Sequence, residues 1–207
     1  MAVSPWLEEN AKNSFLLSKF QTTTILNGGN EKFFRRIDGD FSNLRDEFGI
    51  PKNNKIILFV CPRLNDPIKG YQFIPKLRNN IGDAYSIVVV GKITHDITLF
   101  NGIIYTNEIR DKNKLASIYN MADITLVLSE RETFCMPIVE SLLCGTGVIS
   151  FKCFGPDHAF KRNEVIFIDY GDLNQLIQQI KINTYNVIDN KTNHTSKFMC
   201  EKYFILY

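Results

Sequence analysis

Two short runs of consecutive apolar residues, Ile56–Val60 and Ile87–Val90, constrain the fold of this chain more than any other feature. A strand that is apolar on both faces must be covered on both, which is typical of parallel sheets flanked by helices. Further strands alternate with segments of helical spacing. The expected strands are 56–60, 86–90, 103–105, 124–128, 148–151 and 165–168, and the expected helices are 42–48, 70–80, 112–121, 137–143 and 173–182. This order predicts an α/β fold with a right-handed, doubly wound, Rossmann-like parallel sheet.

Both ends of the chain carry elements outside that alternation. Ser4-Pro5 is a helix start signal, because serine caps a helix and proline suits its first turn, and it predicts an amphipathic helix over 5–18. Residues 22–26 are rich in β-branched side chains and predict a short strand, and Gly28-Gly29 predicts a chain reversal. Apolar residues from Ser196 onward predict a terminal amphipathic helix.

Composition excludes several classes of function. The 24 Lys and Arg residues against 22 Asp and Glu give a net charge of +2, too small to predict binding to nucleic acid. The 5 cysteines include no C-x-x-C pair and the 3 histidines lie far apart, so neither a disulfide framework nor a metal site is expected. Neither a signal peptide nor an apolar run of about 20 residues is present, which predicts a soluble, cytoplasmic chain.

The segment after strand 56–60 places two cations just ahead of a helix. Arg63 and Lys69 follow the strand where ligands of open parallel sheets collect. Cations beside a helix N-terminus form an anion site, and arginine and lysine together suit a diphosphate. Taken alone, two solvated loop cations are the commoner situation.

A second group of polar residues follows strand 124–128. Glu132 lies in the loop and Glu140 in the first turn of the next helix if Pro137 begins that helix. A carboxylate there can accept two hydrogen bonds from ribose hydroxyls, and the loop carboxylate can hold sugar hydroxyls or stabilise charge at an anomeric carbon. The amides of residues 134–136 would point at the bound group. The alternative is a dipole-favoured helix residue and a solvated loop acid.

This part of the chain resembles the group 1 glycosyltransferases of GT-B fold. The family's E-x7-E pattern is matched by Glu132 and Glu140, within the landmarks Ala122-Asp123-Ile124, Ser129, Glu132-Thr133-Phe134, Pro137 and Glu140-Ser141-Leu142-Leu143-Cys144-Gly145-Thr146. Other landmarks occur in family order: Ser4-Pro5-Trp6-Leu7, Asn27-Gly28, Arg63-Leu64, Lys69-Gly70, Val90-Gly91, and Leu115 with Tyr119. The resemblance covers roughly residues 2–180.

The resemblance implies a role for each matching position. Arg63 and Lys69 would bind the diphosphate of a UDP- or GDP-type sugar donor, Glu140 would bind the ribose, and Glu132 the transferred sugar. Glu132, Arg63 and Lys69 would be the catalytic residues. The backbone of Glu108-Ile109 would meet the nucleobase, and Phe134, Cys135 and Met136 would line the donor site. The acceptor would be a glycan or a lipid-linked molecule. Most E-x7-E members retain anomeric configuration and need no metal, so no cofactor is expected.

Four departures from the family pattern stand near these positions. Pro62 replaces the usual glycine and removes a backbone donor. Cys135 also replaces a glycine, and it would either restrict donor size or pack inward as a small apolar residue. Gly147 replaces a proline, and Phe154-Gly155-Pro156-Asp157 replaces Gly-Gly-x-x-Glu. His158 beside Asp157 is expected to be structural or solvent-facing rather than a catalytic base.

In the family, the Ser-Pro-Trp helix and the Asn-Gly turn end the acceptor domain. Residues 1–30 are therefore interpreted as a remnant of that domain, 31–190 as the nucleotide-sugar-binding domain, and 191–207 as a helix that packs on the missing half. Uncovered apolar side chains on the end helices would favour self-association or disorder of these ends. The candidates are Trp6, Leu7, Phe198, Tyr203 and Phe204. Peripheral attachment to the inner face of the membrane is left open.

Two other functions remain alongside the transferase. A non-catalytic nucleotide-sugar-binding or assembly module would keep the fold while Pro62 and Cys135 prevent transfer. A sugar-nucleotide epimerase with a related fold fits the spacing of the charged residues less well. Retention of all four charged positions favours the enzyme.

Overall fold

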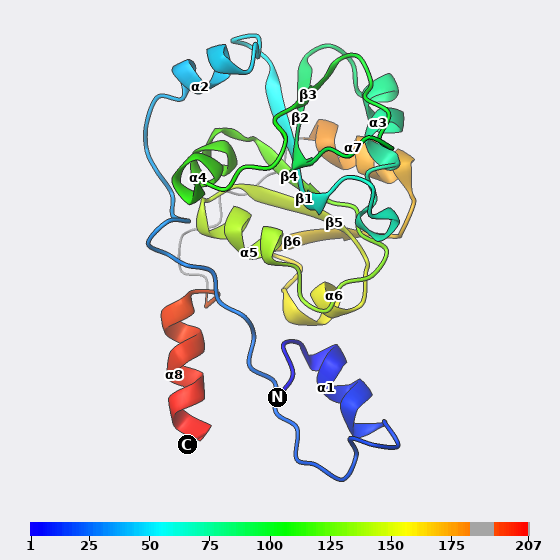
Figure 1. Ribbon diagram of the computed structural model, residues 1–207, viewed down its shortest axis with the longest axis vertical. Coiled ribbons are helices and arrows are strands. Elements are labelled where there is room, and N and C mark those ends of the chain that lie inside the picture. Colours follow the sequence, from blue (N-terminus) through cyan, green and yellow to red (C-terminus); the bar gives the residue numbers. More distant parts are fainter. Residues whose placement is uncertain (183–192, 207) are drawn as a thin grey trace.

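The computed structural model of the chain describes residues 1–182 and 193–206. Its centre is a 6-stranded sheet in the order β3-β2-β1-β4-β5-β6, with every pairing parallel (Figure 1). The strands are β1 (Lys55–Arg63), β2 (Tyr85–Lys92), β3 (Ile103–Tyr105), β4 (Ile124–Val127), β5 (Gly147–Phe151) and β6 (Val165–Ile168). This order, which reverses direction between β1 and β4, is that of a doubly wound Rossmann-like sheet and confirms the predicted fold class.

Helices cover both faces of the sheet. The helices of the described residues are α1 (Pro5–Lys12), α2 (Ser42–Glu47), η1 (Pro67–Lys69), α3 (Phe73–Ile81), α4 (Lys112–Met121), α5 (Met136–Leu143), α6 (Gly155–Ala159), α7 (Leu173–Ile182) and α8 (Ser196–Leu206). The helices α3 and α7 lie on one side of the sheet and α4 and α5 on the other (Figure 1). No helix in the described ranges is long and apolar enough to cross a membrane.

Alternate residues of β1 explain why the apolar runs are continuous. Ile56 and Leu58 belong to the core under α4 and α5, whereas Ile57 and Phe59 belong to the core under α3 and α7. All four side chains are at most 1% exposed. Burial of such residues stabilises the fold by about 1.5–3 kcal/mol each, so both faces of the sheet contribute to stability.

Most predicted elements between residues 42 and 182 occur near where the sequence places them, and two differences stand out. The strand β1 continues to Arg63, beyond the predicted end at residue 60, through a register irregularity between Val60 and Arg63. The short helix α6 was not predicted, because Gly155-Pro156 carries a turn signal.

The predictions for the N-terminal segment were partly wrong. The helix α1 ends at Lys12 rather than at residue 18, and Ser14 instead accepts a hydrogen bond from the amide of Leu17. Serine and asparagine side chains compete with helical hydrogen bonds in this way. Residues 22–26 form no strand, since Thr24 makes only an isolated bridge to Ala2.

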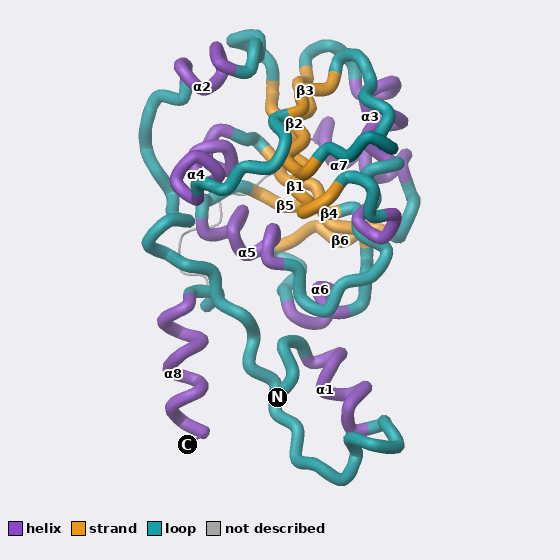
Figure 2. The backbone as a smooth tube through the Cα atoms, viewed as in Figure 1, coloured by secondary structure: helices purple, strands orange, loops and turns teal. Residues whose placement is uncertain are grey.

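The terminal helix α8 extends away from the sheet on the same side as α1 (Figure 2). Backbone hydrogen bonds of 2.8 Å join Gly29 N to His194 O and Ser196 N to Gly29 O, and they attach the start of α8 to the turn at Gly28-Gly29. The domain boundary placed at residues 190/191 lies outside the described residues.

The end helices expose part of the expected apolar surface. Phe204 is 83% exposed, whereas the other four candidates are half-buried. Trp6 is covered in part by Phe154, whose ring centroid lies 5.4 Å away. The side chain of Phe15, which the sequence had placed in a helix, is 91% exposed. Self-association through these ends stays a prediction.

Candidate functional site

The candidate site lies at the carboxyl edge of the sheet, where the strand order reverses between β1 and β4. The segment after β1 carries Lys69 at the end of η1, and the loop after β4 carries Glu132. Lys69 Nζ lies 2.7 Å from Glu132 Oε1, although 63 residues separate the two in sequence. The sequence-based expectation that these charges meet at one rim of the sheet is confirmed for this pair.

A close backbone approach brings the two loops together. Gly70 has φ of 82°, and a Cβ atom at this position would lie 2.0 Å from Leu128 O. The amide of Glu130 donates to Ile68 O at 2.8 Å. Glycine is therefore required beside Lys69, both for the positive φ and for the contact with the end of β4.

A hollow of about 300 Å³ opens beside the Lys69–Glu132 pair, and we call it the Lys69 hollow. Ser129 Oγ donates to Glu132 Oε1 at 2.9 Å, so this carboxylate accepts two hydrogen bonds on one oxygen. Burial disfavours the charge on Lys69, but the hydrogen bond and attraction from Glu132 outweigh it and raise the pKa of Lys69. The lining residues include Pro62, Lys69, Glu132, Phe134, Cys135 and Met136.

A second hollow of about 280 Å³ adjoins the first, and we call it the Glu140 hollow. Both hollows share the walls formed by residues 60–62 and 136–137, so one extended ligand can occupy both. Burial raises the pKa of Glu140, while a hydrogen bond from Tyr119 and the charge of Lys112 oppose the shift. The distance from Tyr119 Oη to Glu140 Oε2 is 2.9 Å.

The loop after β3 forms the far wall of the Glu140 hollow. Glu108 and Ile109 line it, as does Gly91 at the end of β2. Asn107, with φ of 60°, joins these loops: its Oδ1 accepts from the amides of Glu108 at 2.8 Å and Ile93 at 3.2 Å. The two residues assigned to the nucleobase therefore lie beside Glu140, in one cavity.

The sequence predicted Arg63 and Lys69 in one loop, but the structure places Arg63 outside that loop. It is the last residue of β1, where it pairs with Lys92, and its side chain is exposed. Arg63 lines neither hollow. The extension of β1 by three residues beyond Val60 is the reason, because it moves Arg63 from the loop to the strand. Its role at a diphosphate stays a prediction.

The residues before α5 also depart from expectation in one respect. Met136, rather than Pro137, begins the helix, and Cys135 precedes it with φ of 76°, in the region that favours glycine. The Cys135 side chain is buried in the hollow wall, and burial raises the pKa of its thiol well above the ordinary value. The burial agrees with inward packing, and the place in the hollow wall agrees with restriction of donor size, so both alternatives stay predictions. Phe134 is also buried, 5.2 Å from the ring of Phe160.

The positions of Pro62 and His158 also have structural explanations. Pro62 lies at the irregularity of β1, a position where proline is tolerated within a sheet. His158 is exposed and its Nδ1 lies 2.8 Å from Phe154 O, in agreement with a structural or solvent-facing histidine. Within residues 1–182 and 193–206, no group of three His, Cys, Asp or Glu residues could hold a metal ion.

The sequence did not assign a role to Tyr119 or Ser129. Tyr119 appeared only as a landmark of the resemblance, and its bond to Glu140 spans 21 residues. Ser129 was recognised only as part of a motif, although its position three residues before Glu132 offered a local signal. Both hydroxyls hold a carboxylate of the candidate site.

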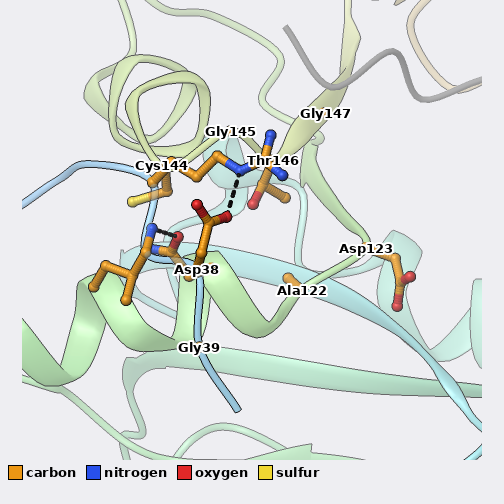
Figure 3. A pocket seen from close by; sticks show the side chains of 11 residues that line it. Asp38, Gly39, Ala122, Asp123, Cys144, Gly145, Thr146 and Gly147 are labelled. Carbon is orange, nitrogen blue, oxygen red and sulfur yellow. Dashed lines mark hydrogen bonds and ion pairs between the residues drawn. The ribbon is translucent and has the colours of Figure 1, made fainter. Parts of the chain in front are cut away.

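A larger hollow, about 410 Å³, lies at the opposite edge of the sheet (Figure 3). It is lined by Ala122 and Asp123 just before β4 and by Gly145 and Thr146 just before β5. Arg36 Nε and Asp38 Oδ1 form an exposed ion pair of 3.2 Å there. Because ligands of doubly wound sheets bind at the carboxyl ends of strands, size alone does not make this hollow the functional site.

The fold and the site together define the class of protein. Residues 40–191 match the family model of Glycosyl transferases group 1, and the chain therefore belongs to this family. It is 22% identical over 174 residues to N-acetyl-alpha-D-glucosaminyl L-malate synthase from Bacillus anthracis, a match that covers 76% of the chain and 44% of that protein.

Solved structures share the fold. The chain superimposes on sucrose-phosphate synthase from Thermosynechococcus elongatus with a TM-score of 0.82 and 20% identity, over 100% of this chain and 56% of that one. The match to HepE from Anabaena in complex with UDP has a TM-score of 0.81 and 18% identity, over 99% and 62% of the two chains. The chain thus spans 44% to 62% of the lengths of these three relatives.

Proposed function

We propose that this chain is the donor-binding part of a retaining glycosyltransferase, which binds a nucleoside-diphosphate sugar of UDP or GDP type. The observation that carries the proposal is the placement of the Lys69–Glu132 pair and Glu140 in two adjoining hollows at the switch point of the sheet. A ligand with a polar nucleoside at one end and a charged sugar phosphate at the other fits this arrangement.

The nucleoside would occupy the Glu140 hollow. Glu140 accepts hydrogen bonds from the ribose hydroxyls, and the apolar walls that include Ile109 and Leu115 cover the base. Glu108 lies at the same wall and its side chain is paired with Arg110 at 3.1 Å, which leaves its backbone as the contact to the base.

The diphosphate and sugar would occupy the Lys69 hollow. Lys69 stays protonated at neutral pH because its pKa is raised, and it faces the phosphates together with the N-terminus of α5. When the donor phosphate binds the Lys69 ammonium in place of Glu132, the Glu132 carboxylate can accept hydrogen bonds from hydroxyls of the transferred sugar. Fixed cationic groups of this kind stabilise the departing diphosphate and make a metal ion unnecessary.

The acceptor would be a glycan or a lipid-linked molecule, bound by a separate acceptor domain. In the reaction, the bond from the anomeric carbon to the phosphate oxygen breaks, and a bond from the acceptor hydroxyl oxygen to that carbon forms on the same face. The proton of the acceptor hydroxyl passes to the departing diphosphate. Lys69 and α5 contribute to the first event by holding the leaving group. The acceptor domain supplies the second reactant.

A non-catalytic nucleotide-sugar-binding module is the second candidate. The observation that favours it is Cys135, whose side chain occupies the wall of the Lys69 hollow at a φ that favours glycine. Transfer of sugar from a donor to an acceptor by the longer protein separates the two functions. If UDP- or GDP-sugars bind and none of them is used for transfer, the function is that of a non-catalytic binding module.

Binding of UDP, GDP and ADP to the chain tests the proposed site. A ligand at a thousandfold excess over its Kd should add about 4 kcal/mol of stability and raise Tm by roughly 10 °C. Lys69→Ala and Glu140→Ala should each reduce that shift. Lys12→Ala is the matched control, because Lys12 is also ion-paired but lies on α1, outside both hollows. Equal shifts in all three variants and the original chain would mean that the site is elsewhere.

A further inference from the structure

We propose that Tyr119 is a positioning residue for the nucleoside, whose buried hydroxyl fixes the Glu140 carboxylate in the orientation that meets the ribose. The proposal rests on the function proposed above and adds a residue to it. Tyr119 does not line the Glu140 hollow, so it acts through Glu140 rather than on the ligand.

The Tyr119 ring is fixed in place by its surroundings. Its exposed fraction is 0%, and it packs edge-on against Phe34 with ring centroids 6.0 Å apart. The backbone carbonyl of Tyr119 accepts from Thr146 Oγ1 at 2.6 Å, which joins α4 to the segment before β5. The hydroxyl therefore reaches Glu140 from a rigid platform, and its direction is set by the packing of α4 on α5.

The two carboxylate oxygens of Glu140 differ in their hydrogen bonds within the protein. Oε2 accepts from Tyr119 at 2.9 Å, whereas Oε1 has no hydrogen-bond partner in the part of the chain that the structure describes. Burial and the neighbouring Glu140 raise the pKa of Tyr119, so the hydroxyl keeps its proton and remains the donor. One oxygen is thus held inside the protein, and the other is left for a ligand hydroxyl.

The charge of Glu140 depends on the groups around it. On α4, Tyr119 and Lys112 favour the ionised form, and Cys144 at the end of α5 interacts with the same carboxylate. Glu108, across the hollow, is the other acidic residue of its lining. Removal of the tyrosine hydroxyl takes away the hydrogen bond that opposes desolvation, so the carboxylate would take up a proton at higher pH.

The test compares Tyr119→Phe with the original chain by titration calorimetry with UDP and GDP from pH 5 to 8. The nucleoside diphosphate that binds should lose about tenfold in affinity, and the loss of binding toward acid should begin at a higher pH than in the original chain. Inorganic pyrophosphate, which has no ribose, should bind both proteins equally. Tyr71→Phe is the matched control, because it removes another buried hydroxyl, which contacts Tyr105 Oη at 2.7 Å.

Affinity and pH dependence unchanged in Tyr119→Phe would overturn the proposal, as would an equal loss for pyrophosphate, which would indicate general damage to the fold. Glu140→Gln keeps the acceptor for Tyr119 but cannot titrate. In that background Tyr119→Phe should no longer shift the pH dependence, and a persistent shift would also overturn the proposal. Absence of nucleoside diphosphate binding by the original chain is a different result, since it would refute the proposed function itself.

Discussion

Replacement of Gly70 by alanine would test whether the contact between the two loops creates the candidate site. An added Cβ would lie 2.0 Å from Leu128 O and 2.6 Å from Leu128 C, both of them backbone atoms. The loop carrying Lys69 would have to move away from the end of β4. The separation of Lys69 Nζ from Glu132 Oε1, now 2.7 Å, would then increase.

The expected loss of stability has two parts. A left-handed φ of 82° costs an alanine about 1–2 kcal/mol. Displacement of packed backbone adds about 1–3 kcal/mol, for a total of about 2–5 kcal/mol. Gly49→Ala is the matched control, because Gly49 has φ of 64° and nothing lies within 4 Å of an added Cβ. This variant should therefore show only the cost of the positive φ.

Urea unfolding measures the stability of both variants, and calorimetry with a nucleoside diphosphate measures the site. Gly70→Ala should lose more unfolding free energy than Gly49→Ala and should bind the ligand more weakly. Gly49→Ala should bind it normally. Equal losses of stability with normal binding in both variants would refute the inference that the Gly70–Leu128 contact sets the distance between Lys69 and Glu132.

Three further outcomes are expected. Glu140→Gln should weaken nucleoside diphosphate binding, which calorimetry measures. It should not lower the stability of the free chain at pH 7, because burial raises the pKa of Glu140 and the charge of this carboxylate opposes folding above that pKa. Unfolding curves measure the stability. Ser129→Ala should weaken binding of a nucleotide sugar more than of the nucleoside diphosphate, because Glu132 loses its 2.9 Å bond; calorimetry with both ligands compares them. The hydrogen bond from His194 lowers the pKa of Glu164, so its stabilisation is complete above about pH 4.3 and is lost as pH falls through the lowered pKa. Glu164→Gln should therefore flatten the acid unfolding curve followed by circular dichroism.

Much of the fold could be predicted because it depends on short-range patterns. The helix Lys112–Met121 and the strand Val165–Ile168 occur at their predicted bounds. Their signals are helical spacing of apolar residues in one case and consecutive apolar residues in the other. The same approach failed for residues 13–18, whose apolar side chains find no core to cover them.

The sequence alone determined the alternation of the six sheet strands with α3, α4, α5 and α7, determined the family, and singled out Glu132 and Glu140 as candidates, because periodicity and motif spacing are properties of the chain itself. Only the tertiary structure decided that Lys69 and Glu132 form a direct ion pair, that Arg63 lies outside both hollows, and that Tyr119 holds Glu140. Those contacts join residues 63 and 21 positions apart. Their geometry depends on where β1 ends and how α4 packs on α5, and no local pattern specifies either.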